Sequence, residues 1–379
     1  MRNLRTIRRS ILSSPDGLSL TASTWDAGTD SVICSYGPTK HDSLIQLKRW
    51  KPSHESTGPN AKLEHITSWD ALCPLPDLDC DVVLNLQYFP DSSTTCIVLR
   101  GGDIVVVREN AQDGEEKIEI VGSVDVGISA AAWSPDEELL AIATSADTFL
   151  FMTRGFENVT DVTFTSDDLK ASKHVSVGWG KAETQFKGKG AKALRDPTMP
   201  EKVDEGLLSR HDDRACHLSW RGDGAYVAVN SLQSSSRRVI RVYTREGVLD
   251  SISEPVDGLE SSLSWRPAGN LLASIQRQEN RLDVIFFERN GLRHGQFGLR
   301  LSIEEMESWG SKIVLKWNAD SSVLAVCLKD RVQLWTMGNY HYYLKQEILL
   351  PFAESNDEPT LFEWHPEKAL RFTTGSSGK

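Results

Sequence analysis

The sequence predicts an all-β protein, a seven-bladed β-propeller, and this prediction rests on one repeated sequence motif. Each copy of the motif has alternating apolar residues, an aromatic residue, a turn rich in Pro, Asp or Gly, and a second apolar run. Alternation is typical of a strand with one buried face, and the turn residues are typical of hairpins. Because a repeat of about 40–45 residues is typical of a WD40 blade, the spacing of this motif indicates a propeller of the WD40 type.

The aromatic residue of the motif recurs at nearly regular intervals along the chain, and we call this position of each repeat its aromatic slot. It is found at Tyr88, Trp133, Trp179, Trp220, Trp265, Trp317 and Trp364, at spacings of 45, 46, 41, 45, 52 and 47 residues. Trp25 fits the same slot more loosely, and the polar stretch 51–62 accounts for its distance of 63 residues from Tyr88. Counting from Trp25 to Trp317 gives seven blades. A large ring at each slot is expected to pack against the neighbouring blade as part of the core.

The later apolar runs predict the remaining strands of each blade. Second runs such as LLAIAT and VLAVCL are almost continuously apolar, as expected for a strand covered on both faces. Third runs such as VIRVYTREG and RVQLWTMGN alternate apolar with polar residues and end in a turn. The run from Asp330 to Trp335 carries Asp and Trp in the positions that a WD repeat uses.

Residues 1–379 are predicted to form one propeller domain. The eighth slot, at Trp364, is followed by half a repeat before the chain stops at Lys379. Residues 360–379 therefore either supply a strand that closes the ring or begin a second propeller in a longer protein. The abrupt end in Gly-Ser-Ser-Gly-Lys favours a fragment.

The composition narrows the class of protein and its compartment. The chain has 379 residues, 39% hydrophobic and 25% charged, with a formal net charge of −11, so unaided non-specific binding to a phosphate backbone is disfavoured. Six cysteines form no CxxC pair, which indicates reduced thiols in a reducing compartment and no metal site. No apolar run is long enough for a membrane span. The Arg-rich N-terminus could be a mitochondrial presequence, but Pro15-Asp16-Gly17 ends it at once. A cytoplasmic location, with the nucleus as a second compartment, is expected.

One repeat, around Trp179, breaks the pattern with a basic insertion that spans residues 181–206. Its first part, residues 181–195, holds five basic residues and one acidic residue and has no apolar second strand. The basic residues are the candidate partner-binding residues: Lys181, Lys187, Lys189, Lys192 and Arg195. Such a loop either meets an acidic partner or a phosphate backbone, or is a solvated insertion without a ligand.

The motifs of the common enzyme classes are missing from the sequence. Neither HExxH nor GxSxG occurs, and the Lys-Gly-Lys-Gly run lacks the spacing of a P-loop. His211-Asp212-Asp213 is either a metal corner or, as we favour, an ordinary polar turn. We therefore expect no catalytic residues, no cofactor and no metal, and a protein that is not an enzyme.

Three segments carry a resemblance to a known family. They are the opening MRNLRTI, the stretch VGWGKAETQF that begins at Val177, and DDRACHLSWRGDG, which begins at Asp212. In these segments the chain resembles the N-terminal end of the IKAP family, the largest subunit of the Elongator complex. The resemblance covers the whole chain, although the blades between the segments are generic.

The resemblance implies a non-catalytic scaffold for the modification of tRNA wobble uridines, of the 5-carboxymethyl type. The implied partners are the radical-SAM and acetyltransferase catalytic subunit and a second propeller subunit, with tRNA contacted indirectly. The resemblance also implies that dimerisation would depend on a helical region expected to be absent from this chain. Other functions also remain open: a generic WD40 adaptor in another multisubunit assembly, a propeller that binds RNA directly through residues 181–195, and, with least support, a propeller hydrolase.

Overall fold

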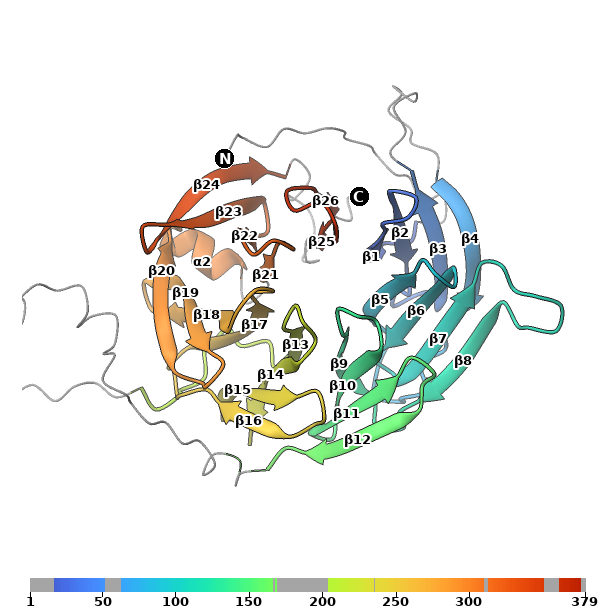
Figure 1. Ribbon diagram of the computed structural model, residues 1–379, viewed down its shortest axis with the longest axis horizontal. Coiled ribbons are helices and arrows are strands. Elements are labelled where there is room, and N and C mark those ends of the chain that lie inside the picture. The colour runs from blue at the N-terminus through green and yellow to red at the C-terminus, as the bar shows by residue number, and fades with distance from the viewer. Residues whose placement is uncertain are drawn as a thin grey trace, which may run out of the picture. The chain divides into compact units, whose positions relative to one another are not determined.

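A computed structural model describes residues 17–51, 63–165, 168, 204–234, 236–309, 313–350 and 361–375. Within these ranges the chain forms six four-stranded antiparallel sheets, a two-stranded sheet and the helix α2 (Ile303–Trp309), as Figure 1 shows. The chain divides into two compact units, Met1–Thr163 with Lys316–Lys379, and Phe164–Leu315. No helix in the described ranges has the length and hydropathy that a bilayer crossing requires.

The first unit contains sheets whose strands pair in chain order. The first sheet consists of β1 (Leu20–Asp26), β2 (Ser31–Tyr36), β3 (Leu44–Trp50) and β4 (Leu63–Asp70). The second consists of β5 (Val83–Phe89), β6 (Thr94–Leu99), β7 (Asp103–Arg108) and β8 (Ile118–Ser123), and the third of β9 (Ile128–Trp133), β10 (Leu139–Thr144), β11 (Thr148–Thr153) and β12 (Asn158–Thr163). A later sheet begins at the boundary between the units and consists of β21 (Val314–Trp317), β22 (Val323–Cys327), β23 (Arg331–Gly338) and β24 (His341–Leu349). The two-stranded sheet pairs β25 (Leu361–Trp364) with β26 (Phe372–Gly375).

The second unit has two four-stranded sheets with the same order. One consists of β13 (His217–Trp220), β14 (Tyr226–Gln233), β15 (Arg237–Thr244) and β16 (Leu249–Ile252). The other consists of β17 (Leu259–Trp265), β18 (Leu271–Gln278), β19 (Arg281–Glu288) and β20 (Arg293–Leu299).

The slot aromatics lie where the repeat predicts them, at or near the end of the first strand of a sheet. Their exposed fractions are between 2% and 8%, so they belong to the core: Trp25, Tyr88, Trp133, Trp220, Trp265, Trp317 and Trp364. Trp179 lies outside the described residues. The described residues form six four-stranded sheets and one two-stranded sheet, consistent with the all-β, seven-bladed propeller that the sequence predicts. The set of slots differs from the predicted one: the seventh described sheet carries Trp364, which the count from Trp25 to Trp317 left out, and Trp179, which that count included, lies outside the described residues.

The middle strands are buried on both faces, as their continuous apolar runs predict. In β10 and β22 almost every residue is buried, whereas the outer strand β12 alternates exposed and half-buried residues. Burial of both faces removes the most apolar area from water in the middle of each sheet, which is the main source of its stability.

The irregular spacings have identifiable causes. The polar stretch 51–62 lies between β3 and β4, which still pair from Trp50 and Leu63 onwards. A second long connector, residues 71–82, joins β4 to β5 and contributes to the same spacing. The 52-residue spacing after Trp265 contains α2, whose first turn is a capping box: Ser302 Oγ accepts from Glu305 N at 3.2 Å, and Glu305 Oε2 accepts from Ser302 N at 2.8 Å.

The sheet of β25 and β26 contacts both β1 and β21. Trp25 Nε1 of β1 donates to the carbonyl of Glu363 at 3.2 Å, and Trp364 Nε1 donates to the carbonyl of Lys316 in β21 at 2.9 Å. Asp30, in the turn after β1, forms ion pairs with Arg371 at 2.6 Å and Lys368 at 3.1 Å. The last strands of the described chain are therefore tied to its first sheet.

The Asp30 contacts predict an acid-dependent loss of stability. Burial alone would raise the pKa of the Asp30 carboxyl, but hydrogen bonds and charge from Arg371 and Lys368 outweigh it and lower the pKa from 3.8 to about 2. A carboxyl with a depressed folded pKa stabilises the fold above pH 4 and loses that effect as the pH falls towards 2. Because Asp30 is 42% exposed, solvent screening should limit the effect to about 1 kcal/mol.

Asp30→Asn is the variant that measures this contribution, because Asn tolerates the φ of +56° at this position. The urea midpoint of the variant should lie below that of the parent chain at pH 7, and the difference should shrink between pH 4 and pH 2. A difference that persists unchanged at pH 2 would contradict the assignment.

Candidate interaction sites

The predicted basic residues Lys181, Lys187, Lys189, Lys192 and Arg195 lie outside the described residues. The structure does describe the chain on either side of them, at Asp168 and from Asp204 onwards. Side-chain contacts hold the chain on both flanks of this interval.

The upstream flank is held by a buried arginine of β15. Arg241 Nε donates to Asp168 Oδ2 at 3.2 Å, and its guanidinium lies 4.8 Å from the centre of the Phe164 ring. Asp168 also accepts hydrogen bonds from the backbone and side chain of Thr165, at 2.9 and 2.7 Å. The Arg241 side chain is fully buried, so this ion pair is shielded from water and is screened little by salt.

The downstream flank is held by one carboxylate. Asp257 Oδ1 accepts three backbone N–H groups in succession, from Glu205, Gly206 and Leu207, at 3.0, 2.9 and 2.9 Å. The next residue, Gly258, has φ +71° and donates its N–H to the Leu207 carbonyl at 2.8 Å. A Cβ at this position would lie 2.0 Å from the Arg277 carbonyl, so both its conformation and its space require glycine.

The turn at residues 211–214 is an internal ion-pair site. The buried Arg238 of β15 pairs with both carboxylate oxygens of Asp212 and donates to Asp213 Oδ1 at 3.1 Å and to the Ala215 carbonyl at 2.8 Å. Asp213 also accepts from Ser261 Oγ at 2.9 Å. The carboxylates that could have formed a metal corner with His211 thus bind a guanidinium instead.

A second buried pair joins β17 to β18. Glu260, which is not exposed at all, pairs with Arg277 Nε, and Arg277 Nη1 donates to the Met306 carbonyl of α2 at 2.7 Å. Burial raises the pKa of the Glu260 carboxyl, and the hydrogen bond from Arg277 partly offsets this. The Arg241, Asp257 and Arg238 contacts together hold Asp168, residues 205–207 and residues 212–215 on the second unit.

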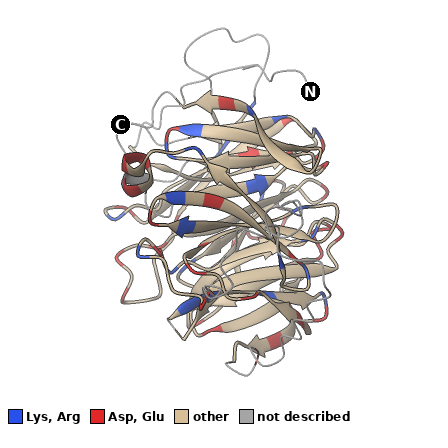
Figure 2. Ribbon diagram, turned by 90° about the vertical axis from the view of Figure 1, so that its left-hand side faces the viewer, with Lys and Arg blue, Asp and Glu red and all other residues tan. Residues whose placement is uncertain are grey.

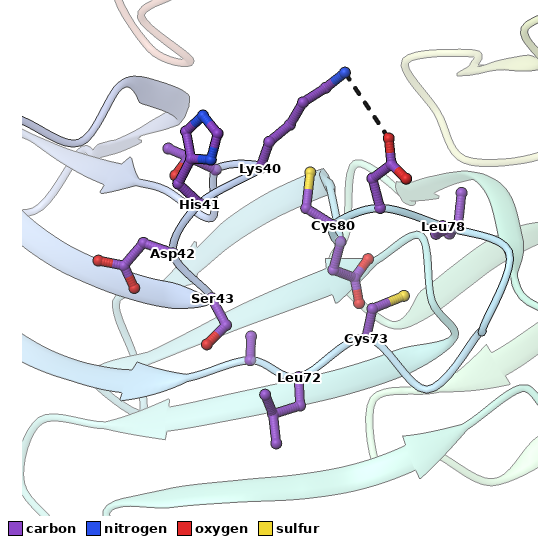
Figure 3. A pocket seen from close by; sticks show the side chains of 12 residues that line it. Lys40, His41, Asp42, Ser43, Leu72, Cys73, Leu78 and Cys80 are labelled. Carbon is purple, nitrogen blue, oxygen red and sulfur yellow. Dashed lines mark ion pairs between the residues drawn. The ribbon is translucent and has the colours of Figure 1, made fainter.

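A polar pocket of about 320 Å³ lies in the first unit, between the β2–β3 turn and the connector of residues 71–82. Its lining residues are Thr39, Lys40, His41, Asp42, Ser43, Ala71, Leu72, Cys73, Leu78, Asp79, Cys80 and Asp81. Figure 3 shows Lys40 and His41 on one side, Cys73 and Cys80 on the other, and a dashed ion pair from Lys40. That pair joins Lys40 Nζ to Asp79 Oδ2 at 3.9 Å, with both side chains largely exposed.

Asp81 is the buried charged residue of this pocket. It is 2% exposed, and its Oδ1 accepts the backbone N–H groups of Val82 and Gly101, each at 2.8 Å. Its Oδ2 is buried without a hydrogen-bond partner. Burial raises the pKa of the Asp81 carboxyl, and the two amide hydrogen bonds oppose that rise. An unpaired buried acceptor of this kind costs about 1–3 kcal/mol of stability.

In the view of Figure 2, basic and acidic positions are both scattered over the strands and loops, and the helix α2 stands out as acidic, with Glu304 and Glu305 in its first turn. Within the described ranges, no group of three or more His, Cys, Asp or Glu residues could hold a metal ion. The pocket at Asp81 was not predicted, because an Asp in a Pro-rich loop gives no sequence signal of burial.

Comparison with known sequences places the chain in one family. A family model described as "ELP1 first N-terminal beta-propeller" matches residues 1–367. Elongator complex protein 1 of Schizosaccharomyces pombe is 48% identical over 295 residues, 77% of this chain and 23% of that protein. The Saccharomyces cerevisiae protein of the same name is 38% identical over 425 residues, 100% of this chain and 30% of that protein, and the Mus musculus one is 42% identical over 309 residues, 78% and 22%.

The chain spans less than a third of the length of these curated relatives. Among solved structures, a chain of the "Crystal Structure of Mitotic Checkpoint Complex" aligns with a TM-score of 0.57 at 10% identity, covering 94% of this chain and 84% of that one. At that identity the likeness concerns the fold alone. The match over residues 1–367 concerns the sequence itself, and the chain belongs to the family of the first N-terminal β-propeller of Elongator complex protein 1.

Proposed function

We propose that this chain is a non-catalytic docking module of an Elongator complex. In that role it binds the radical-SAM and acetyltransferase catalytic subunit and a second propeller subunit, and so supports the modification of tRNA wobble uridines. The observation that carries the proposal is the family match over residues 1–367, together with relatives that bear the name Elongator complex protein 1.

The chemistry of the described side chains supports a binding role. Burial raises the pKa of the Cys34 and Cys96 thiols to about 12, so these cysteines are neutral and poor nucleophiles at physiological pH. The buried charges of the second unit, such as Arg238 and Glu260, are engaged by internal partners. These contacts build the scaffold of a surface rather than a reactive centre.

We further propose that β25 and β26 complete the propeller instead of beginning a second one. The hydrogen bonds from Trp25 to Glu363 and from Trp364 to Lys316 support this, because they join the sheet both to β1 and to β21. In this arrangement residues 361–375 close the ring of a single domain.

The basic segment, with Lys181, Lys187, Lys189, Lys192 and Arg195, is proposed to contact an acidic surface of a partner subunit. Its flanks support this, because Asp168 and Asp257 hold the chain on both sides of the interval. Anchored flanks limit the region in which the segment can meet a partner and so reduce the entropy lost on binding.

The test is a titration of the purified chain against the catalytic subunit, the second propeller subunit and tRNA, each at low and moderate salt. The chain should bind at least one protein subunit. Changing Lys187, Lys189, Lys192 and Arg195 to Ser should weaken that binding, slow association and flatten its salt dependence, because exposed charges act mainly on the association rate.

A matched control removes four exposed basic residues elsewhere, Lys51, Arg100, Lys117 and Arg300, and should leave affinity nearly unchanged. Loss of tRNA binding alone in the segment variant would instead favour a direct RNA-binding propeller. Failure of the chain to bind either subunit, or turnover of acetyl-CoA by the chain alone, would contradict the docking role.

A further inference from the structure

The turn between β25 and β26 carries a histidine at a position that other repeats fill with residues that do not titrate near neutral pH. In the described repeats the residue after the slot aromatic is one of the following: Asp26, Phe89, Ser134, Arg221, Arg266, Asn318 or His365. The His365 side chain is fully buried, and the centre of its ring lies 4.7 Å from that of the Trp25 ring. Histidine is the residue of this set whose charge changes between pH 5 and 8.

The hydrogen bonds of the His365 ring require its neutral form with the proton on Nε2. Nδ1 accepts the backbone N–H groups of Glu367 and Lys368, each at 3.1 Å, so it carries no proton. Nε2 then donates to Asp30 Oδ1 at 3.2 Å, in the turn after β1. A proton on Nδ1 would face two donors, and both of these hydrogen bonds would be lost. Protonation of this ring therefore acts directly on the turn of residues 365–371.

Asn318 fills the same position at the end of β21 and shows the arrangement without a titrating group. Its Oδ1 accepts the backbone N–H groups of Ser322 and Val323 at 3.0 and 2.9 Å, as Nδ1 of His365 does in its own turn. Its Nδ2 donates to the Ala369 carbonyl at 2.7 Å, so Asn318 also contacts the β25–β26 turn. An asparagine thus makes the same kind of local hydrogen bonds as His365, and makes them at every pH.

The groups around the ring oppose its protonation. Lys368 and Arg371 lie on the same turn and both pair with Asp30, at 3.1 and 2.6 Å, so two cations already share the Asp30 carboxylate. Three carboxylates on neighbouring elements are engaged elsewhere, by an arginine, a lysine and a backbone amide respectively: Asp26, Glu363 and Asp320. Burial and the charge of Lys368 lower the pKa of His365, and the hydrogen bond and charge of Asp30 oppose this effect.

A buried histidine with a lowered pKa stabilises its surroundings fully above its ordinary pKa of about 6.5, and this contribution is lost as the pH falls through the lower folded value. The pKa of Asp30, at about 2, belongs to a separate and more acidic range. We propose that His365 is a pH-sensitive switch: its neutral form holds the β25–β26 turn on the turn after β1, and protonation in mildly acidic solution releases this contact. The switch goes beyond the docking role and rests on the proposed closure of the ring by residues 361–375.

The test is hydrogen exchange of the peptide that covers residues 361–375, at pH 7.5 and pH 5.5, corrected for the intrinsic pH dependence of exchange. In the parent chain, exchange should become about three- to tenfold faster at pH 5.5, tenfold being roughly the limit for one group whose pKa is about 6.5 in the open state. His365→Asn introduces the residue of the preceding repeat and should reduce this increase to less than about twofold. His294→Asn changes an exposed histidine and should leave the increase as it is in the parent chain.

The ring resonances of His365 in the parent chain keep the test valid if His365→Asn fails to fold. At pH 7.5 the nitrogen shifts should show a proton on Nε2 and none on Nδ1. The opposite tautomer, or an increase of parental size in His365→Asn, would overturn the proposal. Protection of residues 361–375 that is equal at both pH values would overturn the switch and leave the ring closure standing, whereas no protection at pH 7.5 would overturn both.

Discussion

Replacing Trp265 with alanine should lower the free energy of unfolding by about 3–5 kcal/mol, the range for emptying a large aromatic site in a core. Trp265 is 2% exposed and belongs to a cluster that includes Leu259, Leu272 and Phe287. Its indole Nε1 also donates to the Gly269 carbonyl at 3.1 Å. Alanine would therefore leave both a cavity and a lost hydrogen bond, and urea unfolding at neutral pH measures the sum.

Tyr340 is the matched control for that experiment, because it is also a large aromatic residue but is 86% exposed in the turn between β23 and β24. Tyr340→Ala should change the free energy of unfolding by less than about 0.5 kcal/mol, as expected for a surface position. If Trp265→Ala unfolds at the same urea concentration as the parent chain, the repeat alignment that places this ring in the core is wrong.

The aromatic slots and the middle strands could be predicted from the sequence because both depend on short-range patterns. A ring at a fixed period and a continuous apolar run each leave a direct signal, and Trp265 and the run that forms β10 lie as predicted. The helix α2 was not predicted, although the Ser302–Glu305 spacing matches a capping box. Seven residues are too few for a clear helical period.

The buried charges could not be predicted, because alternation along a strand suggests that polar residues face water. In β15 the arginines interrupt an apolar run, RRVIRVYT, yet Arg238 and Arg241 are as buried as their apolar neighbours. Their partners, Asp212 and Asp168, come from connectors that are distant in sequence, 26 and 73 residues away. Asp81 was missed for a related reason, since its burial depends on the packing of Gly101, 20 residues later.

Replacing Arg238 with alanine should lower the free energy of unfolding by about 3–5 kcal/mol, because it leaves a buried carboxylate without its counter-charge. The Arg238 side chain is fully buried, and that of its main partner Asp212 is 2% exposed. The variant would also remove the donor to the Ala215 carbonyl. Urea unfolding and hydrogen exchange of residues 211–216 would both report the loss.

A double-mutant cycle separates this effect from simple loss of packing. Asp212→Ala should be strongly destabilising in the parent chain but much less so in the Arg238→Ala background, because the second change removes the unpaired charge. Lys51→Ala is the control for an exposed ion pair, since Lys51 and Glu64 are 56% and 62% exposed, and it should cost at most about 1 kcal/mol. Additive effects of the Arg238 and Asp212 changes would show that the two side chains do not stabilise each other, and that the connector of residues 204–216 is held on β15 by other contacts.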